Sequence, residues 1–357
     1  MFSRRRRVYR VLLAGILFSF WTTVLLLGLE LYLRWDRARI AGQNRLLEEN
    51  RALHGAMMEA RAESLWEVER KRYRRNARLA FTMDGVEHVV QTNEHGFRTH
   101  PVQLPKPPDR FRIVCVGGST TVEGTTNETT YPALVEQRLR KRFPHRDLEV
   151  LNCGVSGLDA TVELERLEDY LALEPDLLVE YNVINDLCWH LLPELEHARP
   201  RFERWLRRSE LLAATSLRPG FDQRALDTLL IRRVLSRLAR TEQACRARGV
   251  RAVFASFAAP NPKDPREAVW FEDHMQRVWH RMPRVTLAEY RWAVGRYNTG
   301  LKQWCTGSRI GYLPVAENFP DGGIDTFIDI CHMTQAGIDR KAELVAKLLE
   351  GFVDDQY

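Results

Sequence analysis

The six cysteines of this 357-residue chain include no Cys-x-x-Cys pair, which argues against a structural zinc site. The folded part also lacks a basic surplus. The net charge is +6, but residues 1–78 hold 17 Arg and Lys against 8 Asp and Glu (+9), which leaves −3 for residues 79–357. Nucleic-acid binding therefore has little support. No Lys-Ser/Thr pair follows Gly117-Gly118, which disfavours a phosphate-binding loop.

Charged residues are absent from the apolar run Val11–Leu29, which as a helix would be roughly 28 Å long, close to the thickness of a bilayer core. Five arginines precede the run, and the positive-inside rule then keeps residues 1–10 in the cytoplasm as a basic tail. We expect a transmembrane helix at 11–33 and everything beyond it outside the cytoplasm, in a single-pass protein. A cleaved signal peptide is the alternative, but the run is long for one and no small-x-small site precedes Arg34.

Proline is missing from residues 36–78, which are rich in Arg, Glu, Ala and Leu and so favour helix. We expect a solvated helical stalk over residues 34–78. A partial apolar seam allows a weak dimer through this stalk, although only two or three heptads fit. The seam consists of Leu46, Leu53, Met57 and Ala60.

Residues 79–357 alternate short apolar runs with amphipathic stretches, the pattern of βαβ units and a mostly parallel sheet. The predicted strands of the sheet are 112–116, 148–154, 176–181, 251–257 and 310–315. The predicted helices are 131–142, 161–173, 288–304 and 335–352. Residues 187–245 interrupt the rhythm as a helical insertion, and 260–283 form a second, irregular insert. The fold class is therefore α/β, with one large domain at 79–357.

The two inserts carry four tryptophans, Trp189, Trp205, Trp270 and Trp279. Aromatic side chains suit contact with a sugar or an acyl chain. Burial in the core is the alternative, and we expect it for at least half of them.

Four loops that follow predicted strands each offer one reactive residue type, and in a parallel sheet all four emerge at the same edge. They supply Ser119, Gly154, Asn185 and the pair Asp329/His332. Acyl transfer needs a serine nucleophile, a histidine base and an acid that orients the histidine. Backbone N–H groups of Ser119 and Gly154, with the Asn185 amide, would hold the oxyanion. Each feature alone is also typical of an ordinary loop.

The blocks Gly-Gly-Ser-Thr, Asn-Cys-Gly, Asn-Asp and Asp-Ile-Cys-His together resemble the SGNH (GDSL-type) hydrolase superfamily, and residues 92–98 resemble its membrane-anchored bacterial members. The resemblance covers about 90–186 and 250–350. It implies a three-layer α/β/α sandwich with a five-stranded parallel sheet. It also implies that Ser119, Asp329 and His332 are catalytic. Val183 departs from the family, which usually has glycine there, and a β-branched residue would narrow the turn before Asn185.

The resulting expectation is a membrane-anchored serine esterase that removes acetyl or another short acyl group from a glycan or lipid-linked substrate, without a metal or organic cofactor. An O-acyltransferase with the same triad is one alternative. An inactive, stalked binding or assembly protein is another. The pairing of the cysteines, if any, stays open.

Overall fold

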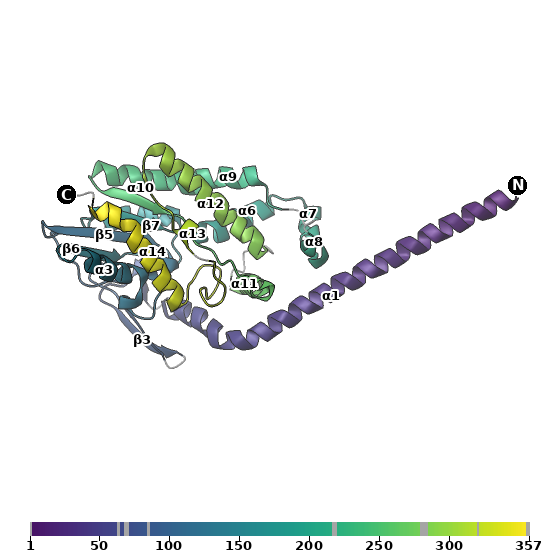
Figure 1. Ribbon diagram of the computed structural model, residues 1–357, viewed down its shortest axis with the longest axis horizontal. Helices are drawn as coiled ribbons and strands as arrows, with labels where there is room; N and C mark the ends of the chain where they lie inside the picture. Colours follow the sequence, from purple (N-terminus) through teal and green to yellow (C-terminus); the bar gives the residue numbers. More distant parts are fainter. Residues whose placement is uncertain are drawn as a thin grey trace.

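The centre of the computed structural model is a five-stranded parallel sheet (Figure 1). The described residues are 2–62, 65–67, 71–83, 86–215, 220–278, 285–319 and 321–354. The strands are β5 (Arg110–Gly117), β6 (Asp147–Asn152), β7 (Leu177–Tyr181), β8 (Arg251–Ala255) and β9 (Gly311–Leu313), in the order β6-β5-β7-β8-β9. All neighbouring pairs are parallel, so the predicted sheet is confirmed. The chain changes its direction of growth at β5, where open sheets place their ligands.

Helices cover both faces of this sheet because its strands bury side chains on both. In β5, Ile113 and Cys115 join one core cluster while Val114 and Val116 join another, since successive side chains point to opposite faces. The helices α3 (Tyr131–Arg142), α12 (Leu287–Ser308) and α14 (Gln335–Asp354) pack on the first face, whereas α5 (Leu167–Leu171) and the end of α10 (Ser236–Ala247) pack on the second. The three-layer α/β/α architecture is confirmed.

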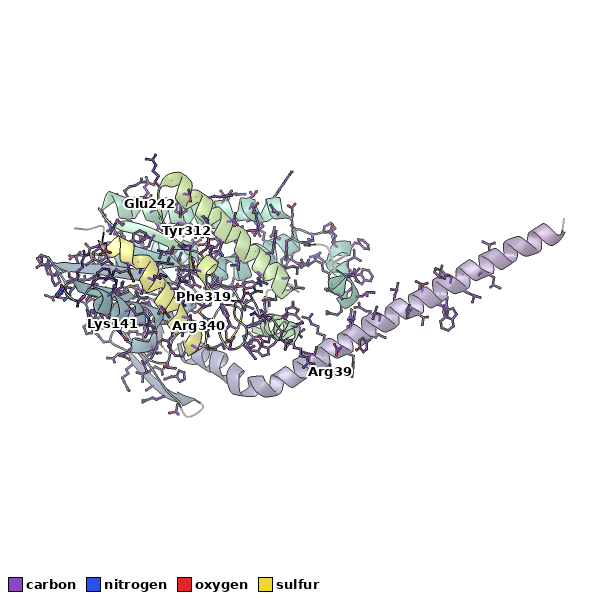
Figure 2. The ribbon with its side chains drawn as sticks, viewed as in Figure 1. Arg39, Lys141, Glu242, Tyr312, Phe319 and Arg340 are labelled. Carbon is purple, nitrogen blue, oxygen red and sulfur yellow. The ribbon has the colours of Figure 1, made fainter. Side chains whose placement is uncertain are left out.

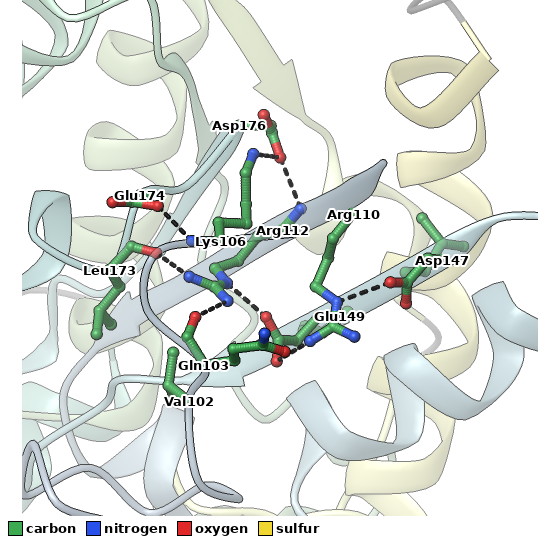
Figure 3. A network of polar contacts seen from close by, with 12 residues as sticks. Val102, Gln103, Lys106, Arg110, Arg112, Asp147, Glu149, Leu173, Glu174 and Asp176 are labelled. Atoms are coloured by element: carbon green, nitrogen blue, oxygen red, sulfur yellow. Dashed lines mark hydrogen bonds and ion pairs between the residues drawn. The ribbon is translucent and has the colours of Figure 1, made fainter. Parts of the chain in front are cut away.

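A buried polar network holds the amino-terminal ends of β5 and β6 together (Figure 3). Arg112 is fully buried, pairs with Glu149 and donates to Leu173 O. Its guanidinium also donates to Gln103 O at 2.9 Å, which fastens the proline-rich lead-in. Asp176 accepts from Arg112 N at 2.7 Å. The charged residues at this edge of the sheet therefore hold the structure together. The reactive residues follow the opposite, carboxyl ends of the strands.

A single helix, α1 (Phe2–Ala62), makes up the amino-terminal part. Its side chains are described from Leu12 to Gly42, a stretch long and apolar enough to cross a membrane. Figures 1 and 2 show its N-terminal half clear of the folded part, whereas Arg39 lies where the helix meets it. The predicted apolar helix is present, and its topology stays a prediction. The seam predicted for the stalk lies outside the residues whose side chains are described.

The helical prediction is wrong for the described residues between α1 and 78. Here β1 (Trp66–Glu67) pairs with β2 (Arg72–Tyr73), and β3 (Arg78–Met83) begins a hairpin with β4 (Val86–Gln91). Tyr73 is buried, and its hydroxyl lies 2.9 Å from Ser156 Oγ. Contacts with the folded part override helix propensity in this stretch.

The helical insertion is present. It consists of the π-helical segments η4 (Asp186–Leu191) and η5 (Ile231–Leu235) and of α6 (Leu192–His197), α7 (Arg201–Leu206), α8 (Glu210–Ala214), α9 (Gln223–Leu230) and α10. The predicted helix at 161–173 is divided into α4 (Ala160–Glu165) and α5. All six cysteines are buried and free.

The prediction of an irregular segment at 260–283 is wrong, because α11 (Pro265–Val278) occupies most of it. Asp264 Oδ1 accepts from Arg266 N at 2.8 Å, and proline follows at the first helical position. An Asp-Pro pair at this place is a helix-start signal. Phe271 and Met275 are fully buried, so one face of the helix joins the core.

Candidate active site

Ser119 is the first residue of a short helix, α2 (Ser119–Val122), which starts two residues after β5. Close packing of β5, β7 and α2 places Ser119 at this end of the strand. A Cβ on Gly117 would lie 2.6 Å from Tyr181 O and would collide with the Thr121 side chain. Glycine at this position therefore lets β5, β7 and α2 approach each other closely.

Ser119, His332 and Asp329 form a continuous hydrogen-bonded chain, although 213 residues separate the serine from the histidine. His332 Nε2 lies 2.7 Å from Ser119 Oγ, and His332 Nδ1 lies 2.6 Å from Asp329 Oδ2. With the proton on Nδ1, held by Asp329, Nε2 accepts from the serine hydroxyl. The three residues predicted as catalytic are thus brought together in the order that a nucleophile, base and orienting acid require.

Asp329 is buried, but its carboxylate accepts hydrogen bonds from backbone N–H groups of the same loop. Its Oδ1 accepts from His332 N at 2.7 Å and from Cys331 N at 2.8 Å. Burial by itself would raise the pKa of Asp329, but the charge and hydrogen bond of His332 and the charge of His274 hold it well below its usual range. The carboxylate therefore stays ionised at any working pH.

His274 is a neighbour of the triad that sequence reasoning missed. It lies on α11, is 7% exposed, and places Nε2 3.9 Å from Asp329 Oδ2. Its ring stacks on Trp270 at 5.7 Å. Only recognition of α11 as a helix, from Asp264-Pro265, could have placed this histidine near the site.

Two of the donors predicted for the oxyanion, the Asn185 amide and the Gly154 N–H, already donate hydrogen bonds within the protein. The Asn185 amide is buried and donates to Leu158 O at 2.8 Å, and a Cβ on Gly118 would lie only 3.2 Å from its Nδ2, so the amide lies against the backbone beside Ser119. The Gly154 N–H donates at 3.1 Å to Asn152 Oδ1, an acceptor that would compete with an oxyanion.

A buried ion pair that the sequence did not suggest ties the serine and histidine segments together. Lys341 of α14 pairs with Glu123 Oε1 and donates to Thr120 O at 2.8 Å. Glu123 Oε2 accepts from Met333 N at 2.8 Å, next to His332. Lys341 Nζ also lies over the Tyr131 ring, 4.6 Å from its centre. The residues after Ser119 and after His332 are therefore fixed by one pair of charges.

Three buried carboxyl groups lie close to the loop that carries Asn185, namely Glu163, Glu180 and Asp186. Asn182 Nδ2 donates both to Glu163 Oε1 at 2.7 Å and to Leu158 O at 2.8 Å. Burial, with little compensation, raises the pKa of Glu180 to about 7 and that of Asp186 to about 8. Burial and the neighbouring Glu180 raise the pKa of Glu163 as well.

Val183, which stands where the resemblance led us to expect glycine, lies in the core. Its side chain is fully buried and belongs to the main core cluster. Of the tryptophans in the inserts, Trp270 is buried, Trp189 is 40% exposed and Trp205 is 65% exposed. Trp279 lies outside the described residues.

Asp329, Cys331 and His332 bring a carboxylate, a thiol and an imidazole within metal-ligand distance of each other. The two ring nitrogens of His332 are already engaged by Asp329 and Ser119. Burial raises the pKa of Cys331 well above its usual value, which disfavours the thiolate that a metal needs. The triad accounts for this cluster of ligand types.

No model of a protein family matches the sequence, and no curated protein matches it either. The structure is similar to solved lipases and esterases. They include a GDSL-like lipase from Parabacteroides merdae (15% identity, 67% of this chain and 94% of that chain, TM-score 0.44) and an acylhydrolase from Bacteroides fragilis (16%, 70% and 92%, 0.42). A third is an acetyl xylan esterase from Geobacillus stearothermophilus (16%, 67% and 94%, 0.41). Because the identities and TM-scores are low, the chemistry is inferred from the site itself.

Proposed function

We propose that this protein is a serine esterase that cleaves short acyl esters through an acyl-serine intermediate. The observation that carries the proposal is the unbroken chain from Ser119 Oγ through His332 to Asp329, with separations of 2.7 and 2.6 Å. Such a chain is the minimum that a serine needs to become a nucleophile at neutral pH.

In the proposed reaction Ser119 Oγ attacks the ester carbonyl while His332 Nε2 takes its proton. His332 then gives that proton to the leaving alkoxide, and water repeats the sequence to release the acid. Asp329 stabilises the protonated imidazole throughout. The N–H of Ser119 and the second N–H of the Asn185 amide would hold the oxyanion. The Gly154 N–H would join them only if it turned from Asn152 Oδ1.

The proposed setting is the outer side of a membrane, with α1 as an uncleaved anchor. The length and composition of Leu12–Gly42 and the arginines that precede the apolar run support this setting. The proposed substrate is a glycan or lipid-linked molecule that carries acetyl or another short acyl group.

The test is hydrolysis of p-nitrophenyl acetate, butyrate and octanoate by the full-length chain in detergent. We expect turnover with the short esters and a loss of about 10⁴-fold or more in kcat for Ser119→Ala. Asn185→Ala should lose about 10²- to 10³-fold. Thr125→Ala, in the loop beyond α2, is the matched control and should stay within a few-fold of the wild type. Equal turnover by Ser119→Ala with an unchanged circular dichroism spectrum would refute the proposal.

A further inference from the structure

Helix α7 presents two large apolar side chains to the outside. Phe202 is 67% exposed and Trp205 is 65% exposed, and their rings stack with centres 6.3 Å apart. They are three residues apart, so they share one face of the helix. Among the described residues outside α1, no other large apolar side chain is as exposed. Aromatic pairs of this kind are not part of the core, and a soluble surface gains nothing from them.

The segment that follows α7 is held by α1. Glu30, the first charged residue after the apolar run, accepts from Ser209 Oγ and Leu211 N at 2.8 Å each and from Glu210 N at 3.1 Å. Arg34 donates to Arg208 O at 3.2 Å. The start of α8 is thus fastened to α1 at the level where the apolar run ends.

A second contact fixes the orientation. Arg37 pairs with Glu210 of α8 at 3.2 Å and with Glu272 of α11 at 2.9 Å. Figure 1 shows α7 and α8 at the end of the folded part that faces the N-terminal half of α1. The folded part therefore meets α1 through two elements and cannot turn freely about it.

The distance from α7 to this level is short. Four residues separate Trp205 from Ser209, which limits their separation to about 14 Å even if the chain were extended. The interfacial layer of a bilayer, outside the hydrocarbon core, is about 5–8 Å thick on each side. Trp35 of α1, 60% exposed, lies five residues beyond Glu30 and is of the type that prefers this layer.

We propose that Phe202 and Trp205 form a second membrane contact, inserted into the interfacial lipid of the leaflet from which α1 emerges. The proposal rests on the anchoring of α1 proposed above. The bilayer is the occupant because Glu30 and Arg37 hold the start of α8, four residues beyond Trp205, against the membrane-proximal part of α1. With two points of attachment the folded part keeps one orientation over the membrane. The insertion that begins directly after Asn185 then links the lipid surface to the active site.

The experiment uses the full chain in phosphatidylcholine/phosphatidylglycerol vesicles, with phosphatidylcholine brominated at shallow acyl positions as the quencher. The emission lost in Trp205→Phe isolates Trp205 from the other tryptophans. We expect this component to be quenched at least about two-fold by the brominated lipid. Trp304→Phe is the matched control, because Trp304 packs on Phe254 in the core at 5.1 Å and its component should not be quenched.

An unquenched Trp205 component in a chain that resists alkaline extraction would overturn the membrane contact and leave the anchor intact. A Trp205 component whose emission depends on protein concentration would also overturn it, in favour of a contact between two copies. Extraction of the chain at high pH would overturn the anchor and this inference together. Hydrolysis of p-nitrophenyl acetate in the same vesicles reports on the catalytic proposal separately.

Discussion

Asp329 and the group formed by Glu163, Glu180 and Asp186 are equally buried, yet their pKa values move in opposite directions. Burial raises the pKa of every one of them. At Asp329 the charges of His332 and His274 outweigh burial, and the carboxylate stays ionised. Glu163 and Glu180 face each other and Asp186 lies near the charge of Asp159, so nothing outweighs burial and the pKa values of all three are raised. The hydrogen bond from His332 and the nearby histidines, and not the depth of burial, distinguish Asp329 from the other three carboxyl groups.

The largest effect is expected from removal of the charge at Asp329. Asp329→Asn keeps the shape but leaves His332 without a charged partner and permits the wrong tautomer, so we expect kcat to fall about 10⁴-fold. The measurement is ester hydrolysis by the full chain in detergent.

Asp325→Asn, in the same loop, is the control and should stay within a few-fold of the wild type. If Asp329→Asn retained more than a tenth of the activity, the ionised state that distinguishes Asp329 from the other three carboxyl groups would not be needed for ester hydrolysis.

The second prediction turns a paired carboxylate into an unpaired one. Lys341→Met leaves Glu123 buried without its cation, which should cost about 3–5 kcal/mol of unfolding free energy. Glu123 then resembles Glu180, a buried carboxyl group with no cation beside it in the described part of the chain. Denaturant unfolding followed by circular dichroism measures the cost, and Lys347→Met on the exposed side of α14 is the control.

The double variant Lys341→Met/Glu123→Gln separates charge from packing. It should recover more than half of the lost stability, because no charge is left without a partner. If it were as unstable as the single variant, the lost contacts of Lys341 other than its pair with Glu123 would be the dominant contribution, and the ion-pair explanation would fail.

The five parallel strands and the reactive residues that follow them could be predicted because both leave local signals in the sequence. Short apolar runs mark the parallel strands, and two of these runs lead into glycine, at Gly117 and Gly154. Ser119 follows β5, Asn185 follows β7, and His332 lies beyond β9, the last strand. The parallel topology then brings the strand ends to one edge without any knowledge of side-chain packing.

The rest depends on contacts between distant segments. Lys341 is 218 residues from Glu123, and nothing in either local pattern indicates a buried pair. Tyr73 forms a strand in a stretch of high helix propensity because Ser156 and the core receive it. The role of Asn152 as acceptor for Gly154 N–H likewise follows from the turn geometry and not from the residue types.

The smallest expected effect is the pH dependence of stability that comes from the buried carboxyl groups with raised pKa values. A carboxyl group whose folded pKa lies above its unfolded value stabilises the protein at low pH and loses that contribution as pH rises through the folded pKa. Because of Glu180 and Asp186, the unfolding free energy of the wild type should fall as the pH rises from about 5 to about 8. The pKa of Asp329 is lowered instead, so the stability that this carboxylate contributes is lost only as pH falls below about 4.

Glu180→Gln removes one of the facing charges, so the fall in stability between pH 5 and pH 8 should become shallower, with a gain of about 1 kcal/mol at pH 8. Denaturant unfolding at several pH values measures this slope. Glu165→Gln, 58% exposed on α4, is the control and should keep the wild-type slope. An unchanged slope for Glu180→Gln would mean that the buried acids are ionised at neutral pH and draw compensation from their amide partners. The histidine partners of Asp329 would then no longer explain why Asp329 differs from them.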